Sequence, residues 1–306
     1  MSKDRSIFQL LFSIVKGMRI WQWPKNLIVF AIPVGTVSTE FLLYQTIFYS
    51  FLGISFLASS VYFFNDIIDV ESDKIHPTKK KRPIPSGQIS IKLAYLTSIL
   101  LALVGGSILA YLSSKAFAFG LLYLLINIAY TFKLKYIKIV DVVSISIMFV
   151  IRVLISSYSV ETPASYFLLG FIFFASTGLA ISKRVSVLND QAININTYYK
   201  NHLDELYSSK DLITALNLTL SLSVITFLFW IGSLRDTSIV SRDSLFFFFA
   251  AILMVSILRE IITLSKMGLL EDFVVGVVNE KKTTNSNLSF VNTFDPRFIW
   301  IKKRFV

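Results

Sequence analysis

The sequence predicts an all-α protein, a polytopic transmembrane helical bundle of about eight or nine spans. Three observations support this fold class. Of the 306 residues, 54% are hydrophobic and only 16% are charged. The apolar residues fall in runs of roughly 17 to 22, the length that a helix needs to cross a hydrocarbon core of about 30 Å. Lysine and arginine gather between those runs, as they do in the loops of membrane proteins.

Eight apolar runs are long enough to be spans. Each is expected to be a helix, because backbone groups in lipid must be satisfied internally and the runs are too long for barrel strands. The expected spans are Leu27–Leu43, Thr46–Phe64, Leu93–Leu112, Ala116–Phe132, Ile139–Tyr158, Ser165–Ile181, Leu212–Gly232 and Ser244–Leu264. A ninth span is not clear, since Phe273–Val278 is too short to cross. Residues 1–306 are expected to form one integral membrane domain, with 266–306 as a polar, basic cytoplasmic tail.

The basic residues set the expected orientation. The formal net charge is +11, and about 25 lysines and arginines fall on one side of the expected spans against three on the other. Both termini and the long loops should therefore be cytoplasmic, in a cell (inner or plasma) membrane. Such basic loops meet membrane lipid or anionic substrates, so no nucleic-acid partner is expected. The stretch Ile7–Val15 is expected to be an amphipathic helix that lies on the membrane.

The composition excludes some site chemistries and draws attention to two arginines. The chain has no cysteine, so it offers no thiol ligand or nucleophile, and its two histidines are too few for a histidine-rich metal site. Arg152 and Arg259 lie inside expected spans. An ionisable group at that depth normally faces the bundle interior or a watery cavity, so both arginines are candidates for function or for pairing with a buried acid.

A group of carboxylates follows the second expected span. Asp66, Asp69 and Asp73 are three and four residues apart, which places them on one face of a helix with Asn65 near its edge. Crowded carboxylates repel one another, and a divalent cation relieves that repulsion. Oxygen ligands suit Mg²⁺, which is usually held by one or two carboxylates together with substrate phosphates. The alternative is a solvated acidic cap at a helix end.

A dense group of cations comes directly after the carboxylates. It includes Lys79, Lys81 and Arg82, and the prolines Pro77 and Pro83 stop the helix and shape a loop around it. A metal together with Lys and Arg is a common clamp for a diphosphate leaving group. The alternative is that these lysines only set the orientation of the chain in the membrane. His76 is expected to be structural.

These motifs resemble a known family. The pattern Asn65-Asp66-x-x-Asp69-x-x-x-Asp73, followed by Arg82-Pro83-x-x-Ser86-Gly87, is similar to the signature of the UbiA superfamily of intramembrane prenyltransferases. Further stretches resemble its decaprenyl-phosphate phosphoribosyltransferase branch. They are Pro24-Lys25-Asn26, His76 to Lys79, Tyr130 to Asp141 and Ala180 to Arg184. The resemblance covers roughly residues 19 to 190 and implies a helical bundle with a cytoplasm-facing active-site cavity.

The resemblance implies an activity and a set of site residues. The branch moves 5-phosphoribose from phosphoribosyl pyrophosphate to a polyprenyl phosphate, releasing pyrophosphate and supplying a pentose donor for the cell envelope. Asp66, Asp69 and Asp73 would hold Mg²⁺ on the diphosphate and are expected to be catalytic. Lys183 and Arg184 are also expected in the catalytic site, gripping a phosphate. The expected substrate-binding residues are Lys25, Asn26, Asn65, Lys79, Lys81, Arg82, Tyr130, Lys133, Asp141 and Arg152.

The sequence also departs from the superfamily pattern. Aromatic prenyltransferases carry a second Asp-rich motif, whereas the corresponding stretch here begins Ser182-Lys183-Arg184 and holds one acid, Asp190. This favours a phosphate-binding role over a second metal. Two alternatives remain open. One is a UbiA-type prenyltransferase that joins a prenyl diphosphate to an aromatic or other small acceptor. The other is a non-enzymatic transporter or lipid-binding membrane protein; the oligomeric state is not predicted.

Overall fold

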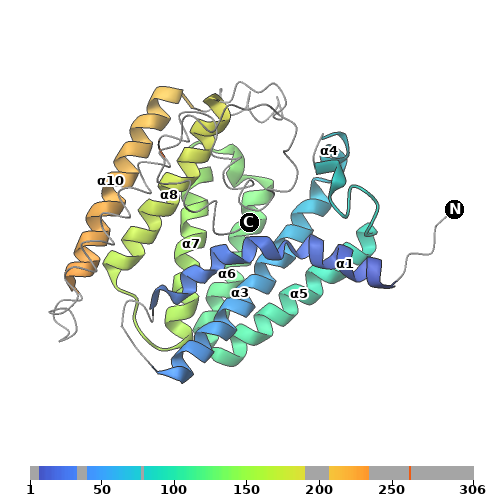
Figure 1. Cartoon of the computed structure of the whole chain (residues 1–306), viewed down its shortest axis with the longest axis horizontal. Helices are drawn as coiled ribbons and strands as arrows, with labels where there is room; N and C mark the ends of the chain where they lie inside the picture. The colour runs from blue at the N-terminus through green and yellow to red at the C-terminus, as the bar shows by residue number, and fades with distance from the viewer. Residues whose placement is uncertain (1–6, 33–39, 77–78, 190–206, 234–261, 263–306) are drawn as a thin grey trace, which may run out of the picture. The chain divides into compact units, whose positions relative to one another are not determined.

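The structure is a computed structural model that describes residues 7–32, 40–76, 79–189, 207–233 and 262. These residues are helical throughout, with short turns between the helices, and contain no strand. The elements, labelled in Figure 1 where there is room, are α1 (Ile7–Met18), η1 (Ile20–Phe30), α3 (Phe41–Ile68), α4 (Val70–Ile75), η2 (Lys79–Lys81), α5 (Ile91–Leu112), α6 (Ser114–Phe132), η3 (Leu134–Tyr136), α7 (Val140–Ser159), α8 (Tyr166–Asn189) and α10 (Ser209–Ser233).

Six helices are long and apolar enough to cross a membrane: α3, α5, α6, α7, α8 and α10. They confirm the all-α fold class and match the expected spans two to seven, although α8 continues to Asn189 instead of ending at Ile181. The expected eighth span, Ser244–Leu264, lies outside the described residues except for Ile262. The expected tail, 266–306, lies wholly outside them, so the domain assignment stays a prediction.

The first expected span, Leu27–Leu43, takes a different form. Its start belongs to the 3₁₀ helix η1, which contains Pro24, and its end belongs to α3, which begins at Phe41. A proline removes one backbone donor and prevents a regular α-helix at this point. The segment therefore begins as a short 3₁₀ element against α3 and α7. Residues 33–39 lie outside the described part of the chain.

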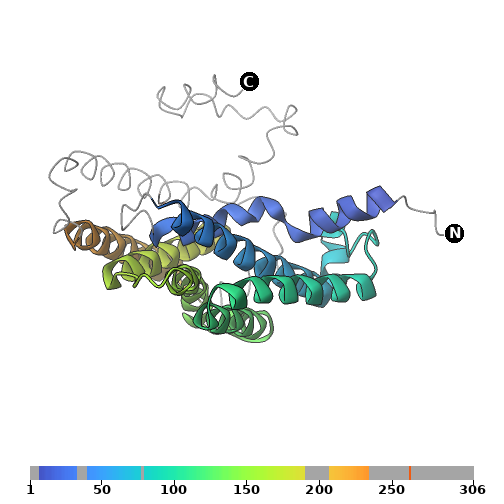
Figure 2. The same cartoon turned by 90° about the horizontal axis from the view of Figure 1, so that it is seen from below.

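Neighbouring helices pack side by side. Figures 1 and 2 both show α3 alongside α5 and α8 alongside α10, and α7 contacts both α6 and α8. Polar contacts join the helices inside the bundle: the hydroxyls of Ser60 and Ser98 are 3.2 Å apart, and those of Ser146 and Thr177 are 2.7 Å apart. Because lipid is as apolar as the helices, such contacts and close packing hold membrane bundles together.

Two glycines allow α3 and α5 to approach closely. A Cβ added at Gly105 would lie 2.6 Å from the carbonyl oxygen of Gly53, and a Cβ added at Gly53 would lie 2.8 Å from Leu109. Leu57 and Leu109 fill the space around this contact and are buried in the main hydrophobic cluster. The contact fixes α5 against α3, the helix that carries the predicted carboxylates at its end.

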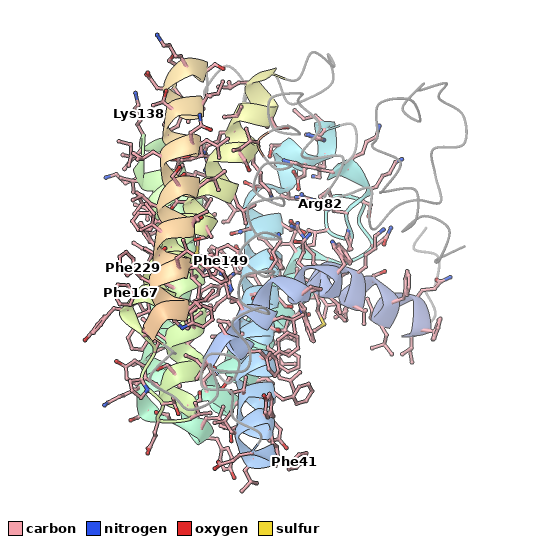
Figure 3. All side chains as sticks on the ribbon, turned by 60° about the vertical axis from the view of Figure 1, so that its left-hand side comes forward. Phe41, Arg82, Lys138, Phe149, Phe167 and Phe229 are labelled. Atoms are coloured by element: carbon pink, nitrogen blue, oxygen red, sulfur yellow. The ribbon has the colours of Figure 1, made fainter. Side chains whose placement is uncertain are left out.

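Most of the predicted site residues gather at one end of the bundle, while Asn26 and Arg152 lie deeper inside it. The hydroxyl of Thr131, in the last turn of α6, lies 2.7 Å from the Asn65 amide oxygen in the last turn of α3. The first turn of α7 is bonded to the last third of α8 through Asp141 and Arg184. Figure 3 shows Arg82 and Lys138 toward this end, with Phe41 at the opposite end of α3.

Helix α1 confirms the helical part of the prediction for Ile7–Val15. One side packs on the bundle through Ser13 and Gly17, and a Cβ at Gly17 would lie 2.6 Å from the ring of Phe63. The other side exposes five large apolar side chains: Ile7, Phe8, Leu11, Phe12 and Val15. That this face lies in the membrane surface stays a prediction.

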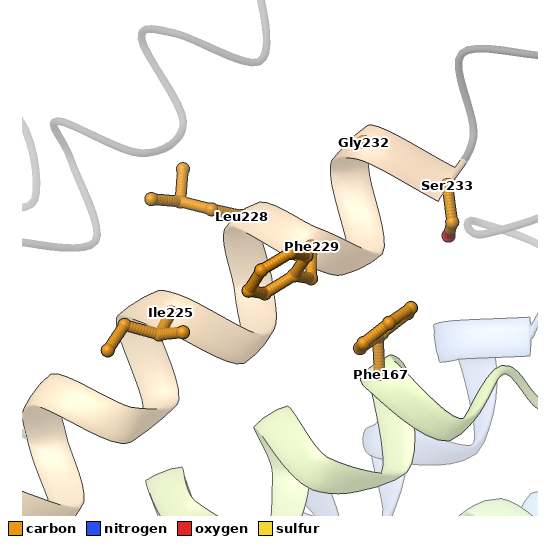
Figure 4. Close-up of a pocket in the computed structure, with 6 residues that line it drawn as sticks. All are labelled: Phe167, Ile225, Leu228, Phe229, Gly232 and Ser233. Atoms are coloured by element: carbon orange, nitrogen blue, oxygen red, sulfur yellow. The ribbon is translucent and has the colours of Figure 1, made fainter.

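An apolar groove lies between α8 and α10, away from the predicted site residues. It has a volume of about 460 Å³, and its lining residues are Phe167, Ile225, Leu228, Phe229, Gly232 and Ser233 (Figure 4). The rings of Phe167 and Phe229 stack there with centroids 5.4 Å apart. The described lining residues offer one hydroxyl and no charge.

Substituting Gly105→Ala should destabilise the protein by about 1–3 kcal/mol, because the new methyl group would overlap the Gly53 carbonyl oxygen. The gain of about 1 kcal/mol that alanine gives a helix over glycine offsets part of this cost, so the net destabilisation should fall at the lower end of that range. The matched control is Gly106→Ala, whose Cβ would meet only the Phe117 ring, at 3.4 Å. Thermal unfolding in detergent measures both, and equal midpoints would contradict the close contact.

Candidate functional site

A bridge between one guanidinium and two carboxylates forms the centre of the candidate site. Arg82 Nη1 donates to Asp66 Oδ1 at 3.1 Å and to Asp73 Oδ2 at 2.6 Å. Arg19 also donates to Asp66 Oδ1. Lys79 Nζ lies 3.9 Å from Asp73 Oδ1. The two carboxylate side chains are only 4% and 2% exposed, so their charges depend on these cations.

The local sequence places this bridge. Helix α3 ends at Ile68 and α4 begins at Val70, so only Asp69 separates them and the acidic face continues from one helix to the next. The loop that carries Arg82 then turns back at Gly87, whose φ of +71° suits glycine, and Ile89 N–H donates to the Pro83 carbonyl at 3.0 Å. Buried Ile84 and Ile89 anchor the loop in the core below.

The donor set fits Mg²⁺ in its chemistry, although the carboxylates are not yet arranged around one point. Asp66 and Asp73 supply oxygen ligands of the kind that Mg²⁺ prefers, while half-buried Asp69 stands between them in the chain. Across the described residues, no three acidic or histidine side chains are grouped as a metal site. Arg82 occupies the position between the two buried carboxylates, so a metal with its phosphate ligands would have to share or displace that contact. The predicted metal ligands therefore stay a prediction.

Arg152 forms a second cluster, inside the bundle. Arg152 is 8% exposed, and its guanidinium donates to Asn26 Oδ1 at 2.9 Å, to the Met148 carbonyl at 3.0 Å and to the Tyr123 hydroxyl at 3.2 Å. It also lies 4.6 Å from the centre of the Phe149 ring, which Figure 3 labels. These partners are neutral, and no salt bridge joins Arg152 to an acid within the described ranges.

Lys25, next to Asn26, is close to other cations. Burial, followed by the charges of Lys183, Arg152 and Arg19, lowers the pKa of Lys25 from 10.5 to about 8. Lys25 is nevertheless exposed to solvent. Its ammonium group therefore remains accessible, although protein atoms lie close to it. Lys183, in the last two turns of α8, is exposed as well. In the part of the chain that the structure describes, neither lysine forms a salt bridge.

A third cluster is a buried ion pair between α7 and α8. Arg184 Nε donates to Asp141 Oδ2 at 2.6 Å, and the Tyr207 hydroxyl donates to Asp141 Oδ1 at 2.6 Å. The Tyr207 oxygen in turn accepts from the backbone N–H of Ile139, whose φ of +69° marks a strained turn into α7. Burial and the bond to Asp141 raise the pKa of Tyr207, so this hydroxyl stays protonated.

The structure thus sorts the predicted residues into groups. Asp66, Asp73, Arg82 and Lys79 come together; Lys25, Asn26 and Arg152 form a neighbouring group; and Asp141 pairs with Arg184. Tyr130, Lys133 and Lys81 lie at the same end of the bundle, at the end of α6 and in η2. Arg19, Tyr123 and Tyr207 are contacts that the sequence analysis missed. Only Arg19 had a signal, its place just before the Pro24-Lys25-Asn26 stretch.

Comparison with known proteins identifies the family. Residues 27–267 match the UbiA prenyltransferase family. The chain belongs to this family. It is 32% identical over 184 residues to the decaprenyl-phosphate phosphoribosyltransferase of Mycolicibacterium smegmatis, covering 58% of each chain. It is 30% identical over 178 residues to the Corynebacterium glutamicum enzyme of that name, covering 56% of this chain and 53% of the relative. The chain thus spans between half and three fifths of these relatives.

More distant UbiA proteins share parts of the sequence or the fold. The digeranylgeranylglyceryl phosphate synthase of Sulfolobus acidocaldarius is 38% identical over 88 residues, 29% of this chain and 31% of the relative. A solved UbiA homologue from Archaeoglobus fulgidus, bound to GPP and Mg²⁺, aligns with a TM-score of 0.60 over 95% of this chain and 93% of its own, at 16% identity. At that identity the likeness concerns the fold alone.

The pairing with Asp141 predicts that Arg184 contributes to stability. Arg184→Gln would leave a buried carboxylate without its cation and should destabilise the protein by about 3–5 kcal/mol. Its neighbour Lys183 is exposed, so Lys183→Gln should change stability by less than about 0.5 kcal/mol. Thermal unfolding in detergent compares the two variants. Equal midpoints would mean that the buried pair does not hold α7 to α8.

Proposed function

We propose that this UbiA family member is a transferase that moves 5-phosphoribose from phosphoribosyl pyrophosphate to a polyprenyl phosphate and releases pyrophosphate. The observation that carries the proposal is the cluster of Asp66, Asp73 and Arg82 at one end of a membrane bundle. It combines carboxylates, which can bind a metal ion, with a guanidinium, which can bind a diphosphate. The names of the relatives from Mycolicibacterium and Corynebacterium support the choice of donor and acceptor. The product would feed a pentose donor for cell-envelope synthesis.

The metal would be Mg²⁺, held by Asp66, Asp69 and Asp73 together with the diphosphate. When bound, it would neutralise negative charge on the pyrophosphate leaving group. The Archaeoglobus fulgidus homologue, which was solved with GPP and Mg²⁺ bound, supports a divalent metal in a protein of this fold. The oxygen-only donor set of this chain supports the same choice.

The first cluster is the group around the bridge from Arg82 to Asp66 and Asp73, and its basic residues would hold the diphosphate itself. Arg82, Arg19 and Lys79 already surround two carboxylates, and guanidinium groups bind phosphate oxygens with two parallel hydrogen bonds. As the bond from the anomeric carbon to the diphosphate breaks, negative charge develops on the leaving oxygen, and these cations stabilise it. The acceptor phosphate is already an anion, so it needs to be positioned and not deprotonated.

We propose that this end of the bundle faces the cytoplasm. The support is the charge asymmetry of the sequence, with about 25 basic residues on this side against three. A water-soluble donor such as phosphoribosyl pyrophosphate would then enter from the cytoplasm, and the polyprenyl tail of the acceptor would lie in the surrounding lipid. Transporter sites typically lie near the bilayer midplane, so a cluster at the bundle end favours an enzyme.

A second candidate is transfer of a prenyl group from a prenyl diphosphate. It is favoured by the same Asp66 and Asp73 cluster, because both reactions expel pyrophosphate, and by the resemblance to digeranylgeranylglyceryl phosphate synthases. The basic stretch at Lys183 and Arg184, where a second acidic motif would stand, argues for the phosphoribosyl donor. The two candidates share the metal diphosphate and differ in the group transferred.

The full-length protein in detergent with Mg²⁺ should transfer label from phosphoribosyl pyrophosphate to a polyprenyl phosphate. A parallel reaction offers a labelled prenyl diphosphate with an aromatic acid or a glyceryl phosphate lipid as acceptor. Label entering the lipid only from the ribosyl donor supports the proposal. Product formed only from the prenyl donor would establish the second candidate, and loss of turnover on chelation is expected in either case.

Matched variants in α4 connect this activity to the cluster. Asp73→Asn should lower turnover at least about a hundredfold, because it removes a buried carboxylate that contacts Arg82. Glu71→Gln is the control, since Glu71 is exposed and pairs only with Lys74 at the surface. Thermal unfolding of both variants separates a lost site from a lost fold. Full activity in folded Asp73→Asn protein would exclude the assigned role.

The orientation has its own test. The chain contains no cysteine, so Ser86→Cys and Ser114→Cys each give a protein with a single thiol. Both positions are exposed, at opposite ends of the bundle. An impermeant maleimide should label the Ser86→Cys variant only when applied to inside-out vesicles and the Ser114→Cys variant only in right-side-out cells. The reverse pattern would place the first cluster outside the cytoplasm.

A further inference from the structure

Among the residues that the structure describes, no acidic side chain balances the charge on Arg152. Arg152 is more than nine-tenths buried, and the partners of its guanidinium are an amide oxygen, a backbone carbonyl and a hydroxyl, from Asn26, Met148 and Tyr123. A buried charge is normally paired with an opposite charge, because removing an ion from water is costly. The three neutral partners hold the guanidinium in one orientation and leave its charge available to an anion.

Two lysines add their charges at the same place. Lys25 is joined to Arg152 through its neighbour Asn26, whose amide nitrogen donates to Ser55 and whose amide oxygen accepts from Arg152. The charges of Lys183 and Arg152 are among those that lower the pKa of Lys25, so each of them repels Lys25 in the absence of a ligand. Lys25 and Lys183 are exposed, which lets a ligand reach them from the end of the bundle where the first cluster lies.

We propose that Lys25, Arg152 and Lys183 form a second anion site, which binds a phosphate monoester. A monoester carries about two negative charges near neutral pH, which suits three cations better than a single carboxylate would. No carboxylate of the described chain pairs with any of the three, so the described part of this site is purely cationic. The nearest acid on α7, Asp141, is already neutralised by Arg184.

The segment that carries Arg19 and Lys25 links the two anion sites. Arg19 donates to Asp66 in the first cluster, and its charge also acts on Lys25 in the second. The proposed reaction would bring a diphosphate to the first site and a monoester to the second. This inference rests on the proposed function, in which both substrates carry a monoester. The donor carries the 5-phosphate of its ribose, and the acceptor carries its lipid phosphate.

Modification of Lys25 provides a binding test that needs no turnover. With a pKa of about 8, Lys25 is half neutral at pH 8 and should react with an amine reagent well before an ordinary exposed lysine such as Lys92. Ribose 5-phosphate and farnesyl phosphate are the two probes, with ribose and farnesol as phosphate-free controls. A bound monoester raises the pKa of Lys25 and shields it, so one probe should slow its modification, as mass spectrometry of the peptides would show.

Variants assign the site to its residues. Lys183→Gln and Arg152→Lys should each weaken the protection of Lys25 about tenfold to a hundredfold, because the first removes a positive charge and the second removes the planar guanidinium that can bind an anion with two hydrogen bonds. Lys92→Gln, an exposed substitution in the first turn of α5, should leave it unchanged. In turnover assays, Lys25→Gln and Lys183→Gln should raise the KM for the donor if ribose 5-phosphate is the protecting probe. They should raise the KM for the acceptor if farnesyl phosphate is.

The outcomes separate this inference from the proposed function. Protection of Lys25 by a monoester in a protein that transfers no phosphoribose would support the second anion site and reject the proposed reaction. Transfer of phosphoribose with no protection by either probe, and with the KM values of Lys25→Gln and Lys183→Gln equal to that of Lys92→Gln, would overturn the second anion site alone. Protection that survives Lys183→Gln and Arg152→Lys equally well would also overturn it.

Discussion

The bridge from Arg82 to Asp66 and Asp73 is the interaction on which the rest of the candidate site depends. Both carboxylates are almost completely buried, and a buried charge is stable only beside an opposite charge. The bridge therefore ties the basic loop to α3 and α4 at once. It also holds the carboxylates and the cations that would bind a diphosphate within one hydrogen-bonded unit. The groups that would bind the ligand are therefore already close together before it arrives.

Charge is distributed unequally among the three clusters. Asp141 and Arg184 neutralise each other, with the Tyr207 hydroxyl completing the pair, so this cluster ties α7 to α8. The first cluster mixes both signs and suits a metal diphosphate. The cluster around Arg152 and Lys25 is purely cationic within the described chain, and such an excess of one sign is where an anionic ligand gains most.

The membrane bundle makes these clusters possible by fixing where its helices end. Lipid gives helices little hydrophobic reason to associate, so close contacts between small residues and interhelical hydroxyl bonds decide the packing. The close approach of Gly53 and Gly105 packs α5 against α3, and the hydrogen bond between Ser146 and Thr177 fixes the position of α8 along α7. With those helices in register, residues from α3, α4, α6, α7 and α8 come to the same end of the bundle.

The sequence by itself determined the all-α membrane fold, the limits of most spans and the carboxylate spacing that continues from α3 into α4. These follow from the lengths of apolar runs and the helical period, which are local properties of the chain. Only the tertiary structure decided which charges pair. Asp66 bonds Arg19, 47 residues away, and Arg184 bonds Asp141, 43 residues away. Residue spacing carries no information on such partners, because packing brings them together, and so the excess charge of Arg152 was visible only after folding.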